Sequence, residues 1–199
     1  KTMRMMLHMA QLEHLAERPQ EANALYQQLL THHHSHKAIV LAYSQFLLQR
    51  GLLSESHEIV SRGLSLWRDD PDLLQRYGAI LFRQCNISAY ADSTRDTASA
   101  HPHHYGCQIA LCQLLLREGK YAETREALLA LSPTSMAHLH KLHQMLAQTY
   151  MRQYKYADAQ REFCTALHHR DHYAHDYLQL AMVQMAQREI LEARATLLQ

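Results

Sequence analysis

Hydrophobic and polar residues follow one another with helical spacing along the chain. In the stretch 146–167, LAQTYMRQYKYADAQREFCTAL, a large apolar, a small and an aromatic residue (Leu146, Ala147 and Tyr150) lie on one side of a first helix. After a short break, apolar and small side chains share one face of a second helix: Tyr156, Ala159, Phe163 and Ala166. The stretch therefore predicts two helices joined by a tight turn.

The same pattern recurs along the chain. The small residue of the first helix returns in steps of 34, 34, 34, 35 and 34 residues, as Ala10, Ser44, Gly78, Cys112, Ala147 and Ala181. Two slots of the second helix return in the same register, a small one as Ala22, Ser56, Thr124, Ala159 and Ala193, and an apolar one as Tyr26, Val60, Leu128, Phe163 and Leu197. Small side chains are needed where two helices cross closely, because a larger group would hold them apart.

This period and order of residues resemble the tetratricopeptide repeat, a helix–turn–helix unit of 34 residues. The resemblance implies an all-α fold, a right-handed α-α superhelix of about six repeats in a single domain. The expected repeats are 3–36, 37–70, 71–104, 105–139, 140–173 and 174–199. The chain stops inside the last repeat without a capping helix, so we expect the parent protein to continue, or a partner or second copy to cover that end.

Local signals refine this interpretation. Gly51 and Gly119 are expected at the turns within repeats two and four, because glycine adopts a positive φ at little cost. The pair Ser132-Pro133 predicts an early end of the helix before it. In repeat three the second helix departs from the pattern at three slots, Tyr90, Thr94 and Thr97, so we expect it to be the most loosely packed, or to contact something outside the chain.

Composition narrows the class of function. Among 199 residues 47% are hydrophobic, enough for a substantial core, and strand-like alternation is absent. A net charge of +1 argues against a general binder of polyanions. The four cysteines have no CxxC spacing, so we expect buried or half-buried free thiols and weakly favour a cytoplasmic, reducing compartment. No apolar run reaches the length of a membrane span.

In the family it resembles, the first helices line the inner, concave surface. The residue after the small slot is Gln11, Gln45, Ala79, Gln113, Gln148 or Met182, and four residues further stand Leu15, Gln49, Arg83, Arg117, Arg152 and Ala186. Glutamine can pair with a peptide backbone and arginine with a carboxylate or phosphate. The same residues also suit solvated helix surfaces and helix ends. The expected peptide-binding residues are Gln45, Gln49, Phe82, Arg83, Gln113, Arg117, Gln148 and Arg152.

Metal binding and catalysis are not indicated. Seventeen histidines are present, and His140 with His143 and His168 with His172 have spacings that could hold a metal, but no third ligand completes a set. We interpret them as polar loop composition and expect no cofactor. His172 and Asp176 are expected to form a surface ion pair. No phosphate loop or nucleophile motif occurs, so we do not expect an enzyme.

The predicted function is that of a scaffold or adaptor, which binds a peptide or protein in its concave groove, an acidic segment being one candidate. Other interpretations stay open at this point. The chain could be the recognition arm of a larger enzyme such as a transferase, or a self-association module using its uncapped last repeat. Single-stranded RNA binding is less favoured, because net charge is near zero and inner aromatic residues are few.

Overall fold

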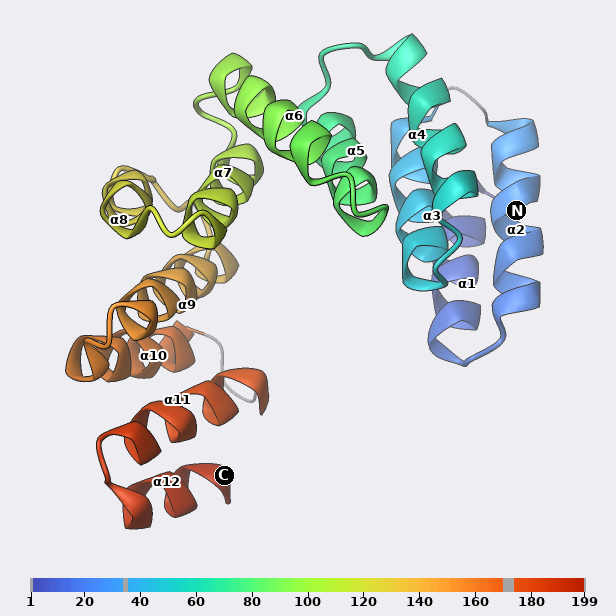
Figure 1. Ribbon diagram of the computed structural model, residues 1–199. Coiled ribbons are helices and arrows are strands. Elements are labelled where there is room, and N and C mark those ends of the chain that lie inside the picture. The colour runs from blue at the N-terminus through green and yellow to red at the C-terminus, as the bar shows by residue number, and fades with distance from the viewer. Residues whose placement is uncertain (1, 34–35, 170–173, 199) are drawn as a thin grey trace. The chain divides into compact units, whose positions relative to one another are not determined.

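The chain folds into helices only, as the pattern predicts. The computed structural model describes residues 2–33, 36–169 and 174–198, in which there are twelve α-helices and no strand (Figure 1). The helices are α1 (Met3–Leu15), α2 (Pro19–His32), α3 (Lys37–Gln49), α4 (Leu53–Leu66), α5 (Pro71–Arg83), α6 (Ile87–Ala100), α7 (Tyr105–Arg117), α8 (Tyr121–Leu129), α9 (Met136–Arg152), α10 (Tyr156–His169), α11 (Ala174–Ala186) and α12 (Ile190–Leu197). The all-α helical-repeat prediction is confirmed. Helix α8 ends just before Ser132-Pro133, as expected.

The chain divides into two compact units, residues 1–101 with α1–α6 and residues 102–199 with α7–α12. Within each unit, consecutive helices pair, and a first helix packs on the helix pair that precedes it, as α5 does on α3 and α4. The assignment of the whole chain to one continuous solenoid domain stays a prediction.

The small-residue slots lie where helices cross. All six first-helix residues of this series are buried: Ala10, Ser44, Gly78, Cys112, Ala147 and Ala181. Ser44 and Ser56 meet at one crossing, where the Ser56 hydroxyl donates to the Ser44 carbonyl oxygen over 3.1 Å. A polar residue is tolerated in this slot because its hydroxyl finds a backbone acceptor.

The second helix of repeat three, α6, buries the three residues that depart from the repeat pattern. Tyr90, Thr94 and Thr97 are only 6–7% exposed. Tyr90 lies next to Gly78 of α5, and a Cβ at Gly78 would be in ordinary van der Waals contact with the Tyr90 ring, at 3.7 Å. The Thr97 hydroxyl donates to the Ser93 carbonyl oxygen over 2.7 Å. The three slots are therefore buried, although less completely than the equivalent Ser56, Val60 and Leu128, which are 0% exposed. That α6 is the most loosely packed helix stays a prediction.

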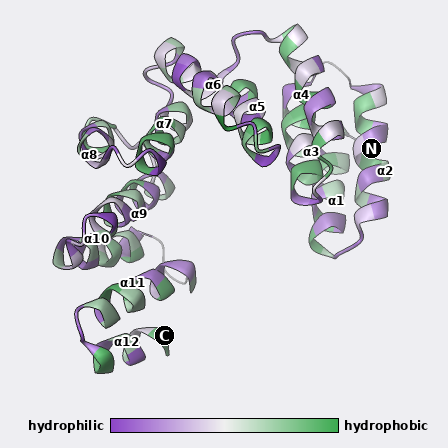
Figure 2. Ribbon diagram, in the orientation of Figure 1, coloured by the Kyte–Doolittle hydropathy of each residue, from purple (hydrophilic) through white to green (hydrophobic). Residues whose placement is uncertain are grey.

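The last repeat differs from the others in one slot. In earlier repeats the apolar residue of the second helix is covered by the next first helix, as Phe163 of α10 is by Leu180 and Val183 of α11. Leu197 of α12 is 53% exposed, and Thr196 is buried in its place. Apolar side chains are exposed on α11 and α12 together: Leu178, Met182, Met185, Ile190, Leu191 and Leu197. Figure 2 shows the alternation of apolar and polar residues along these helices.

Candidate binding surface

Four of the residues expected to bind a partner line one pocket of the second unit. Gln113 and Arg117 come from α7, and Gln148 and Arg152 from α9. Leu116 and Tyr121 complete the walls of this pocket, which has a volume of about 420 Å³ and which we call the arginine pocket. Residues four apart share a helical face, so each helix contributes one amide and one guanidinium group to the same side.

The arginine pocket contains two guanidinium groups. Its lining residues include two arginines and no carboxylate. Within the described part of the chain, Arg152 makes no hydrogen bond or ion pair, and its side chain is exposed. The adjacent Glu118 binds Lys120, with 3.0 Å between the carboxylate and ammonium groups. Because guanidinium groups form strong bidentate contacts with oxyanions, this pocket has the chemistry to hold a carboxylate or phosphate group.

A second pocket, in the first unit, gathers the equivalent residues of repeats one and two. It measures about 310 Å³ and is lined by Gln11, His14, Leu15, Tyr26, Ala42, Gln45, Phe46 and Gln49. Nε2 of His14 lies 2.6 Å from Oε1 of Gln49, and the His14 and Phe46 rings meet edge to face at 5.1 Å. No Lys, Arg, Asp or Glu is among its lining residues, so this pocket offers aromatic surface and amide groups.

Arg76 is a residue of this surface that was not among the expected peptide-binding residues. It lies on α5 and donates from Nη1 to the side-chain oxygen of Gln45 on α3. Its Nε is buried and has no hydrogen-bond partner. Burial lowers the pKa of Arg76 below its ordinary value, although Asp72 nearby favours the charged form. The side-chain oxygen of Gln45 therefore already accepts a hydrogen bond within the chain. Sequence spacing could not predict this contact, because it depends on how α5 packs on α3.

Phe82 and Arg83 do not line either of these pockets. Both are on α5 in the first unit, whereas Arg117 and Arg152 belong to the second unit. Phe82 is half-buried and its ring lies 5.2 Å from that of Tyr90. Arg83 is exposed in the last turn of α5. Part of the Phe82 ring is therefore used in packing α5 against α6.

A buried polar cluster joins α9 and α11. Nε2 of His140 hydrogen-bonds Oδ2 of Asp176, and Nε2 of Gln144 donates to Oδ1 of the same carboxylate over 2.6 Å. Lys141 donates to Oε1 of Gln144 over 2.9 Å, and burial lowers the Lys141 pKa. Asp176 is fully buried, so the prediction that it lies in a surface ion pair is wrong. His172, its expected partner, lies outside the described residues.

Several other described histidines have individual protein partners. His143 contacts Glu162, with 2.7 Å between Nδ1 and Oε2, and the Tyr105 and His138 rings stack at 3.9 Å. In the ranges that the structure describes, no group of three or more His, Cys, Asp and Glu side chains could hold a metal ion. Spacing alone placed His140 and His143 together, but each of them contacts a different carboxylate.

The cysteines have two environments. Cys107 and Cys112 are buried, and burial raises the pKa of Cys112 to about 11. Cys85 and Cys164 are exposed, which differs from the expectation of buried or half-buried thiols. All four are free. Among the described helices, none is both long enough and apolar enough to cross a lipid bilayer.

Comparison with known proteins finds a family model and a relative that match parts of this chain. A family model described as tetratricopeptide repeat matches residues 14–76. The human protein named Protein RRP5 homolog is 23% identical over 126 residues, which are 62% of this chain and 7% of that protein. This chain therefore spans a small part of that relative.

Several solved structures have the same fold over most of this chain. A thermophilic tetratricopeptide-repeat protein of Thermus thermophilus has a TM-score of 0.75 at 14% identity, covering 92% of this chain and 100% of that one. The type IV pilus biogenesis factor PilW has a TM-score of 0.73 at 15% identity, covering 98% of this chain and 91% of that one. A chain of the APC/C hetero-tetramer Cut9–Hcn1 has a TM-score of 0.77 at 10% identity, covering 98% of this chain and 40% of that one. At these identities the likeness is one of fold.

Proposed function

Because residues 14–76 are a tetratricopeptide-repeat segment and the chain has the fold of that family, we propose that it is a scaffold that binds an extended segment of a partner protein on its first helices. The fold generally mediates protein–protein interaction and is typically non-catalytic. We propose in addition that this chain has no enzymatic activity of its own.

The arginine pocket is the observation that supports this proposal. Two amide groups and two guanidinium groups, from α7 and α9, surround one cavity without a carboxylate among them. An extended peptide has unpaired backbone N–H and C=O groups, which glutamine can both donate to and accept from. A peptide carboxylate would meet Arg117 and Arg152. The partner proposed is therefore a segment rich in Asp and Glu.

The proposal predicts a loss of affinity when the two arginines are removed. The probe is an array of extended peptides that differ in net charge, followed by fluorescence anisotropy of the retained ones. The double variant Arg117→Ala and Arg152→Ala should bind acidic peptides roughly tenfold to a hundredfold more weakly, since each of the two hydrogen bonds lost contributes a net of about 0.5–1.5 kcal/mol. Affinity should also fall with added salt.

A matched control removes two arginines from the same unit outside the pocket, Arg161→Ala and Arg194→Ala, and should bind as the unchanged chain does. Adding Arg83→Ala to the double variant tests whether α5 contributes. Equal binding of the double variant and the control would contradict the proposal. So would equal affinity for an RNA oligonucleotide of similar charge, because that would indicate general attraction of polyanions.

A further inference from the structure

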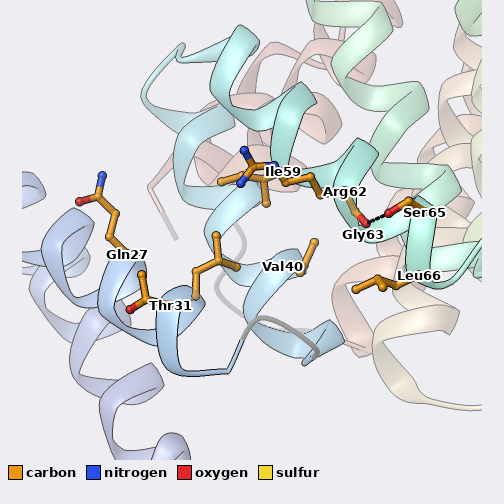
Figure 3. A pocket seen from close by; sticks show the side chains of 9 residues that line it. Gln27, Thr31, Val40, Ile59, Arg62, Gly63, Ser65 and Leu66 are labelled. Atoms are coloured by element: carbon orange, nitrogen blue, oxygen red, sulfur yellow. Dashed lines mark hydrogen bonds between the residues drawn. The ribbon is translucent and has the colours of Figure 1, made fainter.

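A second surface of the first unit is an apolar groove between α2 and α4 (Figure 3). It has a volume of about 670 Å³ and is lined by Gln27, Leu30, Thr31, Val40, Ile59, Arg62, Gly63, Ser65 and Leu66. We infer that this groove binds an amphipathic helix of a partner protein, with a carboxylate beside its apolar stripe. The inference concerns a surface distinct from the arginine pocket and does not depend on the proposed function.

The groove has two helical walls and an apolar floor. Gln27 and Thr31 lie on one wall and Ile59 and Leu66 on the other, with Val40 of α3 between them (Figure 3). Helix α4 can approach α3 closely because Gly63 has no side chain, and a Cβ there would lie 3.0 Å from Val40 Cγ1. Leu66 is 58% exposed although it borders this apolar channel. An apolar partner would remove that surface from water, which is favourable.

The hydrogen-bonding groups of the groove favour a helical occupant. The Thr31 hydroxyl donates to the Gln28 carbonyl oxygen over 2.8 Å. The Ser65 hydroxyl donates to the Arg62 carbonyl oxygen over 2.7 Å (Figure 3). Both hydroxyl protons are thus already donated to the walls' own backbone. Gln27 is the one amide side chain among the lining residues, so an extended peptide would leave most of its backbone groups unpaired against apolar side chains, at a cost of about 1–3 kcal/mol each. A helix satisfies those groups internally.

Arg62 determines the charge of the occupant. It is the one lining residue of the groove with a formal charge. Its Nη2 binds Glu58 one turn earlier, and the two side chains are 70% and 63% exposed. Such an exposed pair is worth at most about 1 kcal/mol, and the guanidinium has five donors, so a partner carboxylate can share or replace Glu58. The groove therefore complements an apolar helix face flanked by Asp or Glu.

The consequence is a chain with two different binding surfaces in its repeats. The first helices offer amides and, in α7 and α9, arginines, which suit an extended acidic segment. The α2–α4 groove offers apolar surface that suits a helix. The bound helix would insert apolar side chains from its positions i, i+3 or i+4, and i+7. Two partners could then be held by one chain at the same time.

The test is selection from a display library of helix-forming peptides against the full chain, followed by binding measurements on variants. Leu66→Glu places a charge in the groove, and Arg62→Glu reverses its one charge. Leu12→Glu on α1, where the leucine is 63% exposed, and Arg68→Glu are the matched controls outside the groove. Circular dichroism verifies that each variant is folded, which is expected because these side chains are exposed.

The selected peptides should carry apolar residues at helical spacing next to Asp or Glu. Their affinity should fall at least tenfold on Leu66→Glu and severalfold on Arg62→Glu, and should not change on either control or on the double arginine variant of the arginine pocket. Equal binding to Leu66→Glu and the unchanged chain would overturn the inference. Sedimentation that shows self-association lost in Leu66→Glu would overturn it too, by assigning the groove to a second copy.

Discussion

At the scale of single residues, the carboxylate of Asp176 is enclosed by polar partners in the second unit. It receives hydrogen bonds from His140 and Gln144 of the neighbouring helix, and all three residues are at most 4% exposed. The carboxylate stabilises the fold chiefly because its removal would take away the acceptor of two buried donors, Nε2 of His140 and Nε2 of Gln144.

The change Asp176→Ala is therefore expected to lower the free energy of unfolding by about 3–5 kcal/mol, the range for removing one partner of a buried pair. Urea denaturation measures it. Asp158→Ala is the control, because Asp158 pairs with Arg161 on the exposed face of α10 and should cost no more than about 1 kcal/mol. A similar small loss for both variants would show that the cluster does not stabilise the contact between α9 and α11.

At the scale of elements, the turn inside each repeat depends on one left-handed residue. Positive φ occurs at Glu17, Gly51, Cys85, Gly119, Tyr154 and Arg188, again at the repeat period. Only the two glycines were recognisable from the sequence. The other four residues adopt a conformation that costs a non-glycine residue roughly 1–2 kcal/mol, so neighbouring helix packing must hold them there.

Two opposite substitutions test this account. Gly119→Ala should destabilise the chain by roughly 1–2 kcal/mol through its backbone alone, because no atom lies within 4 Å of the added Cβ. Cys85→Gly should raise the stability by up to about 1 kcal/mol, the relief of φ being partly offset by a more flexible unfolded chain. Thermal unfolding compares them with Gly119→Asn, whose cost should be smaller. A neutral Gly119→Ala would contradict the explanation.

At the scale of the whole molecule, each compact unit has its own hydrophobic core. In the first unit one cluster joins Tyr26, Tyr43 and Phe46, and a smaller one joins Val60 and Ile80. In the second unit Leu128 packs with Met145, and further along Phe163 packs with Leu180. In repeat proteins such nearest-neighbour contacts supply most of the stability.

We therefore predict that residues 1–101 and 102–199, produced separately, each fold. Circular dichroism should show helical segments that unfold cooperatively, and amide hydrogen exchange should protect the core helices of each. The first segment should retain the helix-binding groove and the second the arginine pocket. A segment that is unfolded alone would show that its core depends on the other half of the chain.

What the sequence by itself determined is the register. Six small residues at a nearly constant spacing predicted every helix pair, because close crossings exclude larger side chains wherever they occur. The same register placed Gln113, Arg117, Gln148 and Arg152 on one face, and the arginine pocket contains all four. Periodicity is a property of the chain itself, so these features needed no knowledge of neighbours.

Only the tertiary structure decided the individual contacts and the shapes of the pockets, because these depend on which side chains meet across helices distant in sequence. The contact of Arg76 with Gln45 joins two helices, and so does the hydrogen bonding of the buried Asp176 to His140 and Gln144. The apolar groove likewise exists only where α2 and α4 border α3. A one-dimensional pattern shows which face a residue occupies, but the volume, charge and hydrogen-bonding groups opposite that face are set by packing.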